Sequence, residues 1–409
     1  MKRILFSFLA LAAGIVLSGC EKSSGPTDTT SVPDQTDGRI TIINDETRLA
    51  ARVTVSDATI SIDTTLRKTG RTARFSMKLT ATIAPPTVGG QTLQATSVVF
   101  DGNYAYVSYN MQGSSAIGAI DVIQIKSVKN ATLRSEATFT DTDVSSVFYS
   151  NNTMYLAEAT SNPAYTSPAV IEAIAIKSGK LDLTSNFRRM LSSYAATSVR
   201  VASGKVYVTT GNNGGLYTLT QNDTLTVEAF TPLTDARWVD GDATHVVVAQ
   251  GGNPGQLAVL NPATGAVIST FSVSGMTIPE SKSTVRVIGG KALVAAGDGG
   301  IQLLDLASGT VVGSIPRTTV AGLDPSVTVT NAADATGPFI YISNGEAGVY
   351  VAEASQNLED MSGTALISLN VLGKLQFSNL QSVNHVAYDG STLAVAAGLG
   401  GTKFVTVSF

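Results

Sequence analysis

Cysteine, histidine and tryptophan are nearly missing from this chain of 409 residues, which contains one cysteine, two histidines and one tryptophan. A single cysteine excludes any disulfide within the chain, and so few thiols and imidazoles leave no cluster with the spacing of a zinc site. The motifs G-x-S-x-G and H-E-x-x-H are also absent. The sequence therefore indicates neither a nucleophile elbow nor a zinc protease, and we expect no metal and no cofactor.

Charge is scarce as well. Charged residues make up 14% of the chain and hydrophobic residues 43%, a balance that excludes an intrinsically disordered protein. The net charge of −4 gives no electrostatic reason to expect nucleic acid as a partner. Beyond the N-terminus, no apolar run is long enough for a membrane-spanning helix.

The N-terminal stretch Met1–Cys20, MKRILFSFLALAAGIVLSGC, has a basic start, a short apolar run and small residues before its cysteine. This order is typical of a secretion signal. The residues Leu17-Ser18-Gly19-Cys20 resemble the bacterial lipobox, which implies cleavage before Cys20 and lipidation of that residue. A lipid anchor would be stable, because each buried methylene adds ~0.8 kcal/mol. The alternative is a plain signal with an incidental cysteine.

Two short regions precede the body of the chain. Residues 21–38 are mostly serine, threonine, aspartate and proline, so we expect a flexible tether. The non-aspartate residue after Cys20 resembles the sorting pattern of outer-membrane lipoproteins, which implies an outer-membrane or cell-surface location. Residues 39–73 alternate weakly between apolar and polar, which predicts a small β extension of two or three strands.

A unit of strand, glycine turn, strand, glycine-rich loop and strand occurs seven times, and it is clearest at Ser283–Leu306. The second strands start 40 to 53 residues apart, and they read YAYVSY, TMYLAE, KVYVTT, HVVVAQ, KALVAA, FIYISN and TLAVAA. Such a period with several short β runs is typical of propeller blades. One sheet cannot bury both of its faces, but blades packed around an axis can.

We therefore predict an all-β fold over residues 74–409, a seven-bladed β-propeller of four-stranded antiparallel blades. An outer strand precedes each unit, including the first, where Arg74–Ile83 reads RFSMKLTATI. The chain stops at Phe409 on a third strand. We expect Arg74–Ile83 to close the ring as the outer strand of the last blade. The single tryptophan argues against a quinone-cofactor propeller, which usually repeats tryptophan through its blades.

In such blades, the loops between second and third strands share one face with the links between blades. On this face, candidate ligand-binding residues are Tyr165 in the long loop 159–168, Asn212 and Asn213 in GNNG, and Asp298 in GDG. Glycine permits tight turns and close approach of a ligand to backbone. The alternative is that glycine is simply the residue that the turns require.

The innermost strands suggest an axial site. When the units SVRVASG, ARWVDGD and TVRVIGG are aligned on their turns, Arg200, Arg237 and Arg286 take one register and should form an arc beside the channel. Two residues earlier, the same strand face carries Ser97, Ser146, Ser198, Asp235, Thr284 and His385. The arc could hold a carboxylate or sulfate. Alternatively, each arginine pairs with Asp235, Asp240, Asp298 or Glu346 and ties blades together.

The strands GAIDVIQI, GIQLLDLASG and GVYVAEAS, with the preceding YVSY, YVTT and YISN, resemble the LVIVD-type propeller repeats of bacterial secreted and surface lipoproteins. The opening LQATSVVFDGNYAYVSYN is similar to the start of such propellers in the Bacteroidota cell envelope. The resemblance covers residues 74–409. Its motifs form blades, so they are specific for the fold and carry no functional residues.

From these features we expect a lipid-anchored, non-catalytic binding module at the cell envelope, which engages a protein partner or a glycan through its loop face. Two alternatives stay open. One is a propeller enzyme of the lyase or lactonase type, with His385 and the three arginines at an axial site. The other is a scaffold subunit of an outer-membrane assembly, with its affinity on the blade rims and an inert channel.

Overall fold

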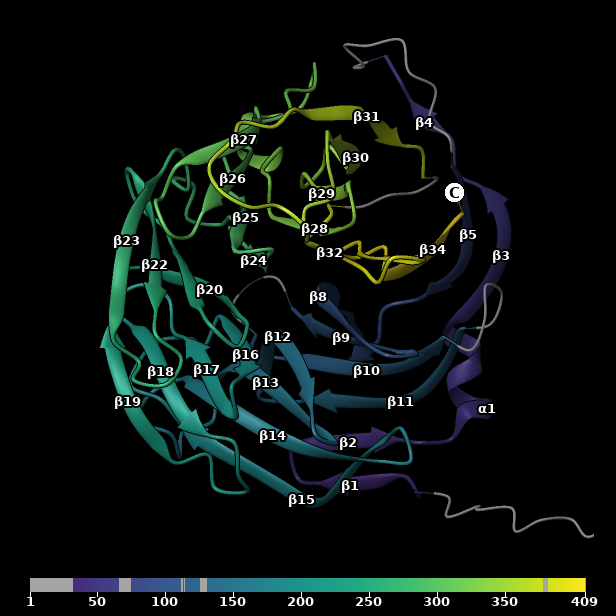
Figure 1. Ribbon diagram of the computed structural model, residues 1–409. Helices are drawn as coiled ribbons and strands as arrows, with labels where there is room; N and C mark the ends of the chain where they lie inside the picture. Colours follow the sequence, from purple (N-terminus) through teal and green to yellow (C-terminus); the bar gives the residue numbers. More distant parts are fainter. Residues whose placement is uncertain are drawn as a thin grey trace, which may run out of the picture. The chain divides into compact units, whose positions relative to one another are not determined.

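Seven antiparallel sheets follow one another along the chain, and each contains four strands that are neighbours in space (Figure 1). The structure is a computed structural model that describes residues 32–65, 75–111, 113, 115–125, 131–377 and 382–408. The expected signal segment with Cys20, and residues 21–31 of the expected tether, lie outside the described residues.

Each blade has the same strand order, from the axis outward. The innermost strands are β8 (Gln94–Asp101), β12 (Thr142–Ser150), β16 (Ser198–Ala202), β20 (Ala236–Gly241), β24 (Val285–Ile288), β28 (Ala332–Thr336) and β32 (His385–Tyr388). The second strands are β9 (Tyr104–Asn110), β13 (Thr153–Thr160), β17 (Lys205–Thr209), β21 (Val246–Gln250), β25 (Lys291–Ala295), β29 (Phe339–Ser343) and β33 (Thr392–Ala396). The third strands are β10 (Gly118–Ile125), β14 (Ala169–Lys177), β18 (Gly215–Thr220), β22 (Gly255–Leu260), β26 (Ile301–Asp305), β30 (Val349–Ala354) and β34 (Thr402–Ser408). The outer strands are β11 (Ala131–Phe139), β15 (Lys180–Met190), β19 (Val227–Pro232), β23 (Val267–Val273), β27 (Val311–Ile315), β31 (Leu369–Leu375) and β5 (Ser76–Ile83).

The second and third strands are buried on both faces, because every blade is packed between two others. All five residues of β25 and of β33 are buried, which explains why their last four residues, ALVA and LAVA, are continuously apolar rather than alternating. The hairpins that join first and second strands are tight. In blade 5, Gly289 and Gly290 both have positive φ, the conformation that a two-residue hairpin turn requires.

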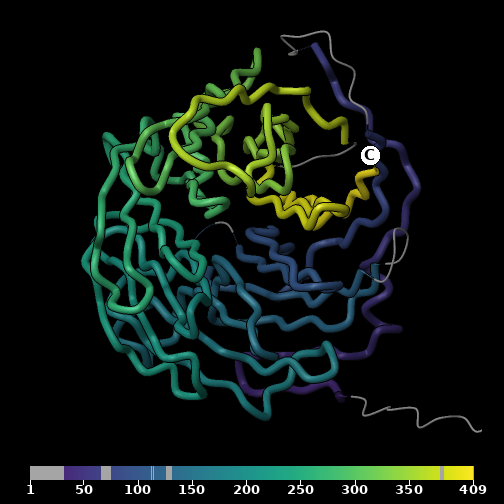
Figure 2. Tube along the Cα trace, viewed as in Figure 1, coloured from purple at the N-terminus to yellow at the C-terminus, as the bar shows by residue number. Residues whose placement is uncertain are grey.

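The ring is closed as the sequence predicted. Each innermost strand contacts the next, and β32 contacts β8. Strand β5 pairs with β34, with Met77 opposite Val407 and Leu79 opposite Val405. Figure 2 shows the yellow C-terminal strand beside the purple-to-blue N-terminal part of the chain. The two ends of the propeller are therefore held together in one sheet, which opposes opening of the ring.

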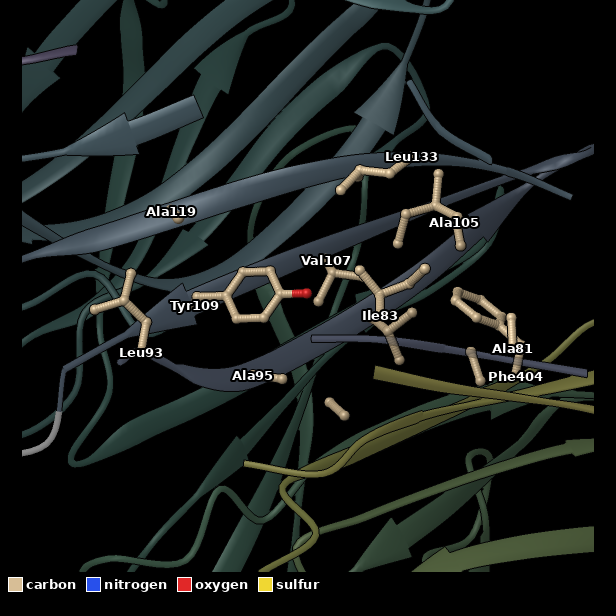
Figure 3. Close-up of a cluster of buried hydrophobic side chains, with 14 of the residues drawn as sticks. Ala81, Ile83, Leu93, Ala95, Ala105, Val107, Tyr109, Ala119, Leu133 and Phe404 are labelled. Atoms are coloured by element: carbon tan, nitrogen blue, oxygen red, sulfur yellow. The ribbon is translucent and has the colours of Figure 1, made fainter. Parts of the chain in front are cut away.

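Apolar side chains fill the seam between the last and first blades (Figure 3). Ile83 and Phe404 come from blade 7, and Val107 and Tyr109 come from blade 1. All four are fully buried. Complete burial of a large apolar side chain contributes about 1.5–3 kcal/mol, so this cluster stabilises closure along with the strand pairing.

The N-terminal residues run along the outside of the ring and do not form a separate unit. Strand β2 (Ile40–Ile43) pairs with β11, β3 (Val53–Thr59) with β5, and β4 (Ile62–Asp63) with β31. The expected β extension therefore lengthens blades 1, 7 and 6 at their outer edges. A short helix α1 (Glu46–Leu49) and a 3₁₀ turn (Ala50–Arg52) join β2 to β3.

The expected boundary of the tether at residue 38 is wrong. Strand β1 (Gln35–Asp37) pairs with β2, and the turn between them uses Gly38 with a positive φ. Polar composition suggested a tether because the side chains of β1 are hydrophilic. These residues belong to the sheet of blade 1 through backbone pairing, which amino-acid composition does not indicate.

Two arginines fasten this N-terminal segment to buried carboxylates. Asp121 in GAIDVIQI and Glu172 in AVIEAIAI occupy the same position of the third strand in blades 1 and 2, and both are fully buried. Arg52 pairs with Asp121 at 2.7 Å and also with Glu136, while Arg39 pairs with Glu172. Without Arg52, Asp121 and Glu136 would be buried charges without a cation, whereas Glu172 also has Arg188, whose Nε lies 3.2 Å from Glu172 Oε2.

Three smaller elements complete the described chain: the two-stranded ribbon of β6 (Thr87–Val88) and β7 (Gln91–Thr92), and a 3₁₀ turn at Pro325–Val327. Among the described residues, none of the helices has the length and apolar character needed to cross a membrane.

Candidate functional site

Two rings meet across the propeller axis. Trp238 on β20 and His385 on β32 stack with their centroids 5.1 Å apart and an angle of 28° between the ring planes. Each residue is 9% exposed. Trp238 lines two separate cavities, one toward each end of the axis. The stacked pair therefore lies between a cavity on the side of the first hairpin turns and a cavity on the loop face.

The turn-side cavity is the larger, at about 600 Å³. Its wall carries four side chains of alternating charge from four consecutive blades: Arg200, Asp240, Arg286 and Asp334. Arg200 Nε lies 3.0 Å from Asp240 Oδ1, and Arg286 Nη1 lies 3.6 Å from Asp240 Oδ2. Arg286 Nε lies 3.3 Å from Asp334 Oδ1. Burial raises the pKa of Asp334, while the nearby carboxylates of Asp334 and Asp240 raise the pKa of Arg286. The positive charges of this wall are thus matched by carboxylates.

The expected arc of three arginines is wrong for Arg237. Arg200 faces Tyr207 on the second strand and Arg286 faces Leu293, whereas the equivalent position of blade 4 is Asp240, which faces Val247. The cause is the position of the turn. The sequence alignment places the turn of blade 4 at Asp240-Gly241, but Gly241 still pairs with Val246 and the chain turns at residues 242–245. Arg237 therefore lies three positions before the true equivalent of Arg200.

The same shift changes the set of residues expected two positions before the arginines on the innermost strands. In blade 4 this place belongs to Trp238, which faces Ala249, and not to Asp235. Ser198 and His385 hold the equivalent places in blades 3 and 7, opposite Thr209 and Ala396. The stacked Trp238 and His385 rings therefore come from one layer of the channel.

Arg237 lines the other cavity, on the loop face, which has a volume of about 330 Å³. Its guanidinium pairs with Asp235 Oδ2 at 2.9 Å from Nε and 2.7 Å from Nη2, and its Nη1 donates to the carbonyl of Ile278 at 2.8 Å. The pair lies directly against Gly251 of the loop GGNPG. A Cβ there would come within 2.0 Å of Asp235 and 2.1 Å of Arg237, so a larger residue would have to displace this ion pair.

The loop-face cavity has two cations. Arg237 is paired with Asp235, whereas Lys282 has no carboxylate partner among the described residues. Its Nζ donates to the carbonyl of Ser145 at 3.3 Å and lies 5.6 Å from the centre of the Trp238 ring. Burial lowers the pKa of Lys282 to about 8. The side chain is therefore mostly charged at pH 7, and its charge is poorly compensated.

The rest of the loop-face cavity is lined by neutral polar groups and by one exposed aromatic residue. Tyr194 is 81% exposed at the rim. The remaining polar lining includes Asn110, Thr197, Thr210, Asn212 and Ser281, with Glu280 as the acidic member besides Asp235. Amides and hydroxyls both donate and accept hydrogen bonds, so this lining suits a ligand with many hydroxyl groups.

His385 is uncharged in this setting. Burial, with a smaller effect from the charge on Lys282, lowers the pKa of His385 to about 3. Its Nδ1 has no hydrogen-bond partner in the structure. The enzyme alternative joined His385 to all three arginines, but Arg237 lies on the opposite side of the stacked rings. Within the described ranges, no group of three or more acidic, histidine or cysteine side chains could hold a metal ion.

The other sequence-predicted residues all lie in loops of the loop face, and one of them lines the cavity. Asn212 lines the loop-face cavity, whereas Asn213 is exposed in the same turn with a φ of 56°. Asp298 accepts hydrogen bonds from Thr277 N at 2.9 Å and Oγ1 at 2.6 Å, so it fixes a link between blades. The ring of Tyr165 lies 5.1 Å from the Arg188 guanidinium and does not line the cavity.

Sequence reasoning missed Lys282, Trp238 and Tyr194. Lys282 and Tyr194 lie on links between an outer strand and the next innermost strand, and these links do not follow the repeated pattern of the blades. The link before β24 does carry a signal: Pro279, Glu280 and Lys282 interrupt a stretch that is otherwise poor in charge.

Together, seven closed antiparallel blades and an axial channel with a cavity at each end define this chain as a seven-bladed β-propeller. The comparison with solved structures agrees: the RRP9 WD40 repeats match with a TM-score of 0.56 at 11% identity, over 85% of this chain and 99% of that chain. The computationally designed Ika8 protein matches with a TM-score of 0.49 at 11% identity, over 86% and 96%. At such low identity, the first likeness concerns the fold alone.

No family model matches the chain. The search of curated proteins also gives no match.

Proposed function

We propose that this chain is a lipid-anchored binding protein of the bacterial cell envelope, and that its loop-face cavity takes the carboxylate of an acidic glycan. The observation that carries the proposal is Lys282, a cation in that cavity with no carboxylate paired to it within the described chain. A buried charge costs stability unless a partner compensates it. The carboxylate of a ligand would supply this partner.

The opposite cavity suits an anion less well. Its two arginines are paired with Asp240 and Asp334 on the wall, so an incoming carboxylate would compete with groups already in place. Arg237 is likewise engaged by Asp235 and by the carbonyl of Ile278. Lys282 therefore offers the stronger attraction for a ligand anion.

The surroundings of Lys282 favour a sugar acid over an acidic protein segment. Apart from Lys282, Glu280 and the Arg237–Asp235 pair, the polar lining of the cavity consists of neutral amides and hydroxyls, which match the alternating donors and acceptors of sugar hydroxyl groups. Tyr194 presents an exposed ring at the rim, against which the apolar face of a sugar ring can lie. The volume of about 330 Å³ lies at the small end of ordinary ligand sites, which suits one or two sugar units.

The proposed location is supported by the N-terminal sequence. The signal-like stretch Met1–Cys20 ends in residues that resemble a lipobox, and polar residues follow it. The blade motifs resemble LVIVD-type repeats of envelope lipoproteins. A lipid-anchored protein on the envelope would meet acidic polysaccharides at the cell surface.

Calorimetric titration of the full chain with D-glucuronate and with D-glucose tests the ligand class. We expect glucuronate to bind, and glucose to bind at least tenfold more weakly, because it lacks the charge-assisted contact. Lys282→Met should weaken glucuronate binding by a similar factor. Lys177→Met, on an exposed lysine outside the cavity, should leave it unchanged.

The same titration has a pH signature. Because burial places the pKa of Lys282 at about 8, glucuronate affinity should fall as the pH rises from 7 to 9 and the ammonium loses its proton. Equal affinity for glucose and glucuronate, or unchanged affinity in Lys282→Met, would contradict the proposal. Binding of a short glutamate-containing peptide in place of glucuronate, lost in Lys282→Met, would assign the site to an acidic protein partner instead.

A further inference from the structure

The outer edges of the blades are covered unequally by the rest of the chain. Strands β2, β3 and β4 cover blades 1, 7 and 6. In blade 5, the N–H of Ile367 donates to the carbonyl of Val312 at 2.8 Å. In blades 3 and 4, β19 and β23 are the last strands of their sheets, and within the described residues no backbone group bonds to their outer sides.

The uncovered edges are also apolar. Val227 and Phe230 on β19 are 38% and 43% exposed, and Val267 and Ile268 on β23 are 43% and 57% exposed. Exposed edge strands pair readily with other chains, and soluble proteins usually protect them with charges, prolines or a cover. Strand β19 has Glu228 and ends at Pro232, whereas β23, VISTFSV, contains neither a charge nor a proline.

The covered edge of blade 1 shows what an added strand looks like in this ring. Ile40, Thr41, Ile42 and Ile43 of β2 lie opposite Phe139, Thr138, Ala137 and Glu136 of β11. The apolar residues Ile40 and Ile42 are almost fully buried there. Arg39 extends the ladder, because its carbonyl accepts from Thr140 N at 3.0 Å. An alternating, β-branched strand therefore suits such an edge.

Strands β11 and β23 are equivalent residue by residue along this stretch. Phe139 lies opposite Gly118 at the start of the third strand of blade 1, and Val273 lies opposite Gly255 in blade 4. Both outer strands then carry a bulge at the same place, at Arg134 and at Ile268. Residues 270–273 of β23 thus correspond to the part of β11 that is covered by β2. Figure 1 shows β23 and β2 at different places along the rim.

We propose that the outer edge of β23 is the docking site for an extended strand of a partner polypeptide, added antiparallel to residues 270–273 as β2 is added to β11. The partner strand has alternating β-branched apolar residues and no charge in its central part, as β2 has, because residues 270–273 carry no charge and the exposed Val267 and Ile268 lie next to them. Main-chain hydrogen bonds provide affinity in this mode of recognition, and alternate side chains provide specificity.

Blade 1 shows which backbone N–H groups of an outer strand point outward, away from the third strand. Since Thr140 N donates outward to Arg39, the alternate residues Thr138 and Glu136 also direct their N–H groups outward. Their equivalents on β23 are Ser272 and Thr270. Proline at position 272 would remove one outward donor and place its ring on the edge, with no loss of a hydrogen bond to β22.

The test uses a fluorescent synthetic peptide with the sequence GRITIIND, residues 38–45 of this chain, and the full-length protein. The equivalent edge of blade 1 is already occupied by the protein's own β2. We expect saturable binding by fluorescence anisotropy. Ser272→Pro should weaken it at least tenfold, and the matched control Ser272→Ala should leave it unchanged. Absence of binding, or equal binding to folded Ser272→Pro, overturns the proposal.

Peptide variants keep the test independent of protein folding. Two versions of the peptide carry backbone N-methyl groups on alternate residues, so that each blocks one of the two edges of the bound strand. We expect one version to lose binding to the unaltered protein and the other to keep it. Equal behaviour of the two versions would show apolar association without strand pairing and would overturn the proposal.

Discussion

Trp238 and His385, from opposite parts of the ring, stack at 5.1 Å and separate the two axial cavities. Neither the distance along the sequence nor the residue types suggested this contact. It arises because both residues occupy the same layer of the innermost strands. Each cavity therefore offers a ligand its own approach, from one end of the axis.

The buried imidazole makes stability sensitive to acid. Because burial lowers the pKa of His385 to about 3 from 6.5, the unfolded chain takes up a proton first as the pH falls below 6.5. Stability should therefore fall by about 2 kcal/mol between pH 6.5 and 4.5 from this group. In His385→Gln this part of the acid sensitivity should disappear. Guanidinium unfolding at the two pH values measures it.

The matched control for that measurement is His245→Gln, because the side chain of His245 is 31% exposed and makes no contact with the axis. This variant should keep the acid sensitivity of the unaltered protein. If His385→Gln and His245→Gln lose stability equally between the two pH values, His385 is not held neutral by burial.

Lys282 should reduce the stability of the ligand-free protein. Burial lowers its pKa to about 8, so at pH 7 the folded chain carries a poorly compensated charge that the unfolded chain carries in water. We expect Lys282→Met to raise the free energy of unfolding by about 1–3 kcal/mol at pH 7, after allowance for the solvent that still reaches the side chain.

The pH dependence of this effect has a definite sign. Between pH 8 and 10.5 the unfolded chain binds more protons at Lys282, so the stability of the unaltered protein should rise there while that of Lys282→Met should not. The advantage of the variant should therefore shrink from pH 7 to pH 9.5 in thermal unfolding. A variant that is less stable at pH 7 would show that Lys282 already has an adequate partner.

Arg52 should be essential for fastening the N-terminal segment. It pairs with Asp121 and Glu136, both buried, and its Nη2 donates to the carbonyl of Ala84 at 2.7 Å. Arg52→Met leaves two buried carboxylates without their cation and should cost about 3–5 kcal/mol, measured by urea unfolding. Arg48→Met is the control, because the Arg48 side chain is 65% exposed. Similar losses in both variants would contradict this role.

The lipid anchor can be tested by metabolic labelling with radioactive palmitate in a Gram-negative host. We expect the unaltered chain to incorporate label and to fractionate with membranes. Cys20→Ser should abolish labelling, because Cys20 is the one cysteine of the chain. Label in the Cys20→Ser protein, or an unlabelled protein with an intact Cys20, would rule out lipidation at this residue.

The sequence was sufficient for the fold because each blade repeats one local pattern. Strands rich in valine, isoleucine and tyrosine, with turn residues between them, recur every 40 to 53 residues, and the segment that ends at Ile83 could be assigned to the last blade by counting strands. The β strands of the N-terminal part were harder to place. These strands pair with the outer strands of blades 1, 7 and 6, and their amino-acid composition does not indicate which outer strand each one joins.

The site was less predictable, since it depends on register and on links between blades. The turn of blade 4 lies three positions later than the sequence indicated, so Asp240 takes the expected place of an arginine and Arg237 lies at the other cavity. Lys282 belongs to no strand and repeats in no other blade. Only the folded ring brings it over Trp238 and beside Asn212.

A crystal structure of the full chain soaked with D-glucuronate tests the central claim most directly. The account predicts electron density for the sugar acid in the loop-face cavity, with its carboxylate within about 3 Å of Lys282 Nζ and the sugar ring toward Tyr194. Density confined to the turn-side cavity beside Arg286, or an empty loop-face cavity at saturating ligand, would contradict it.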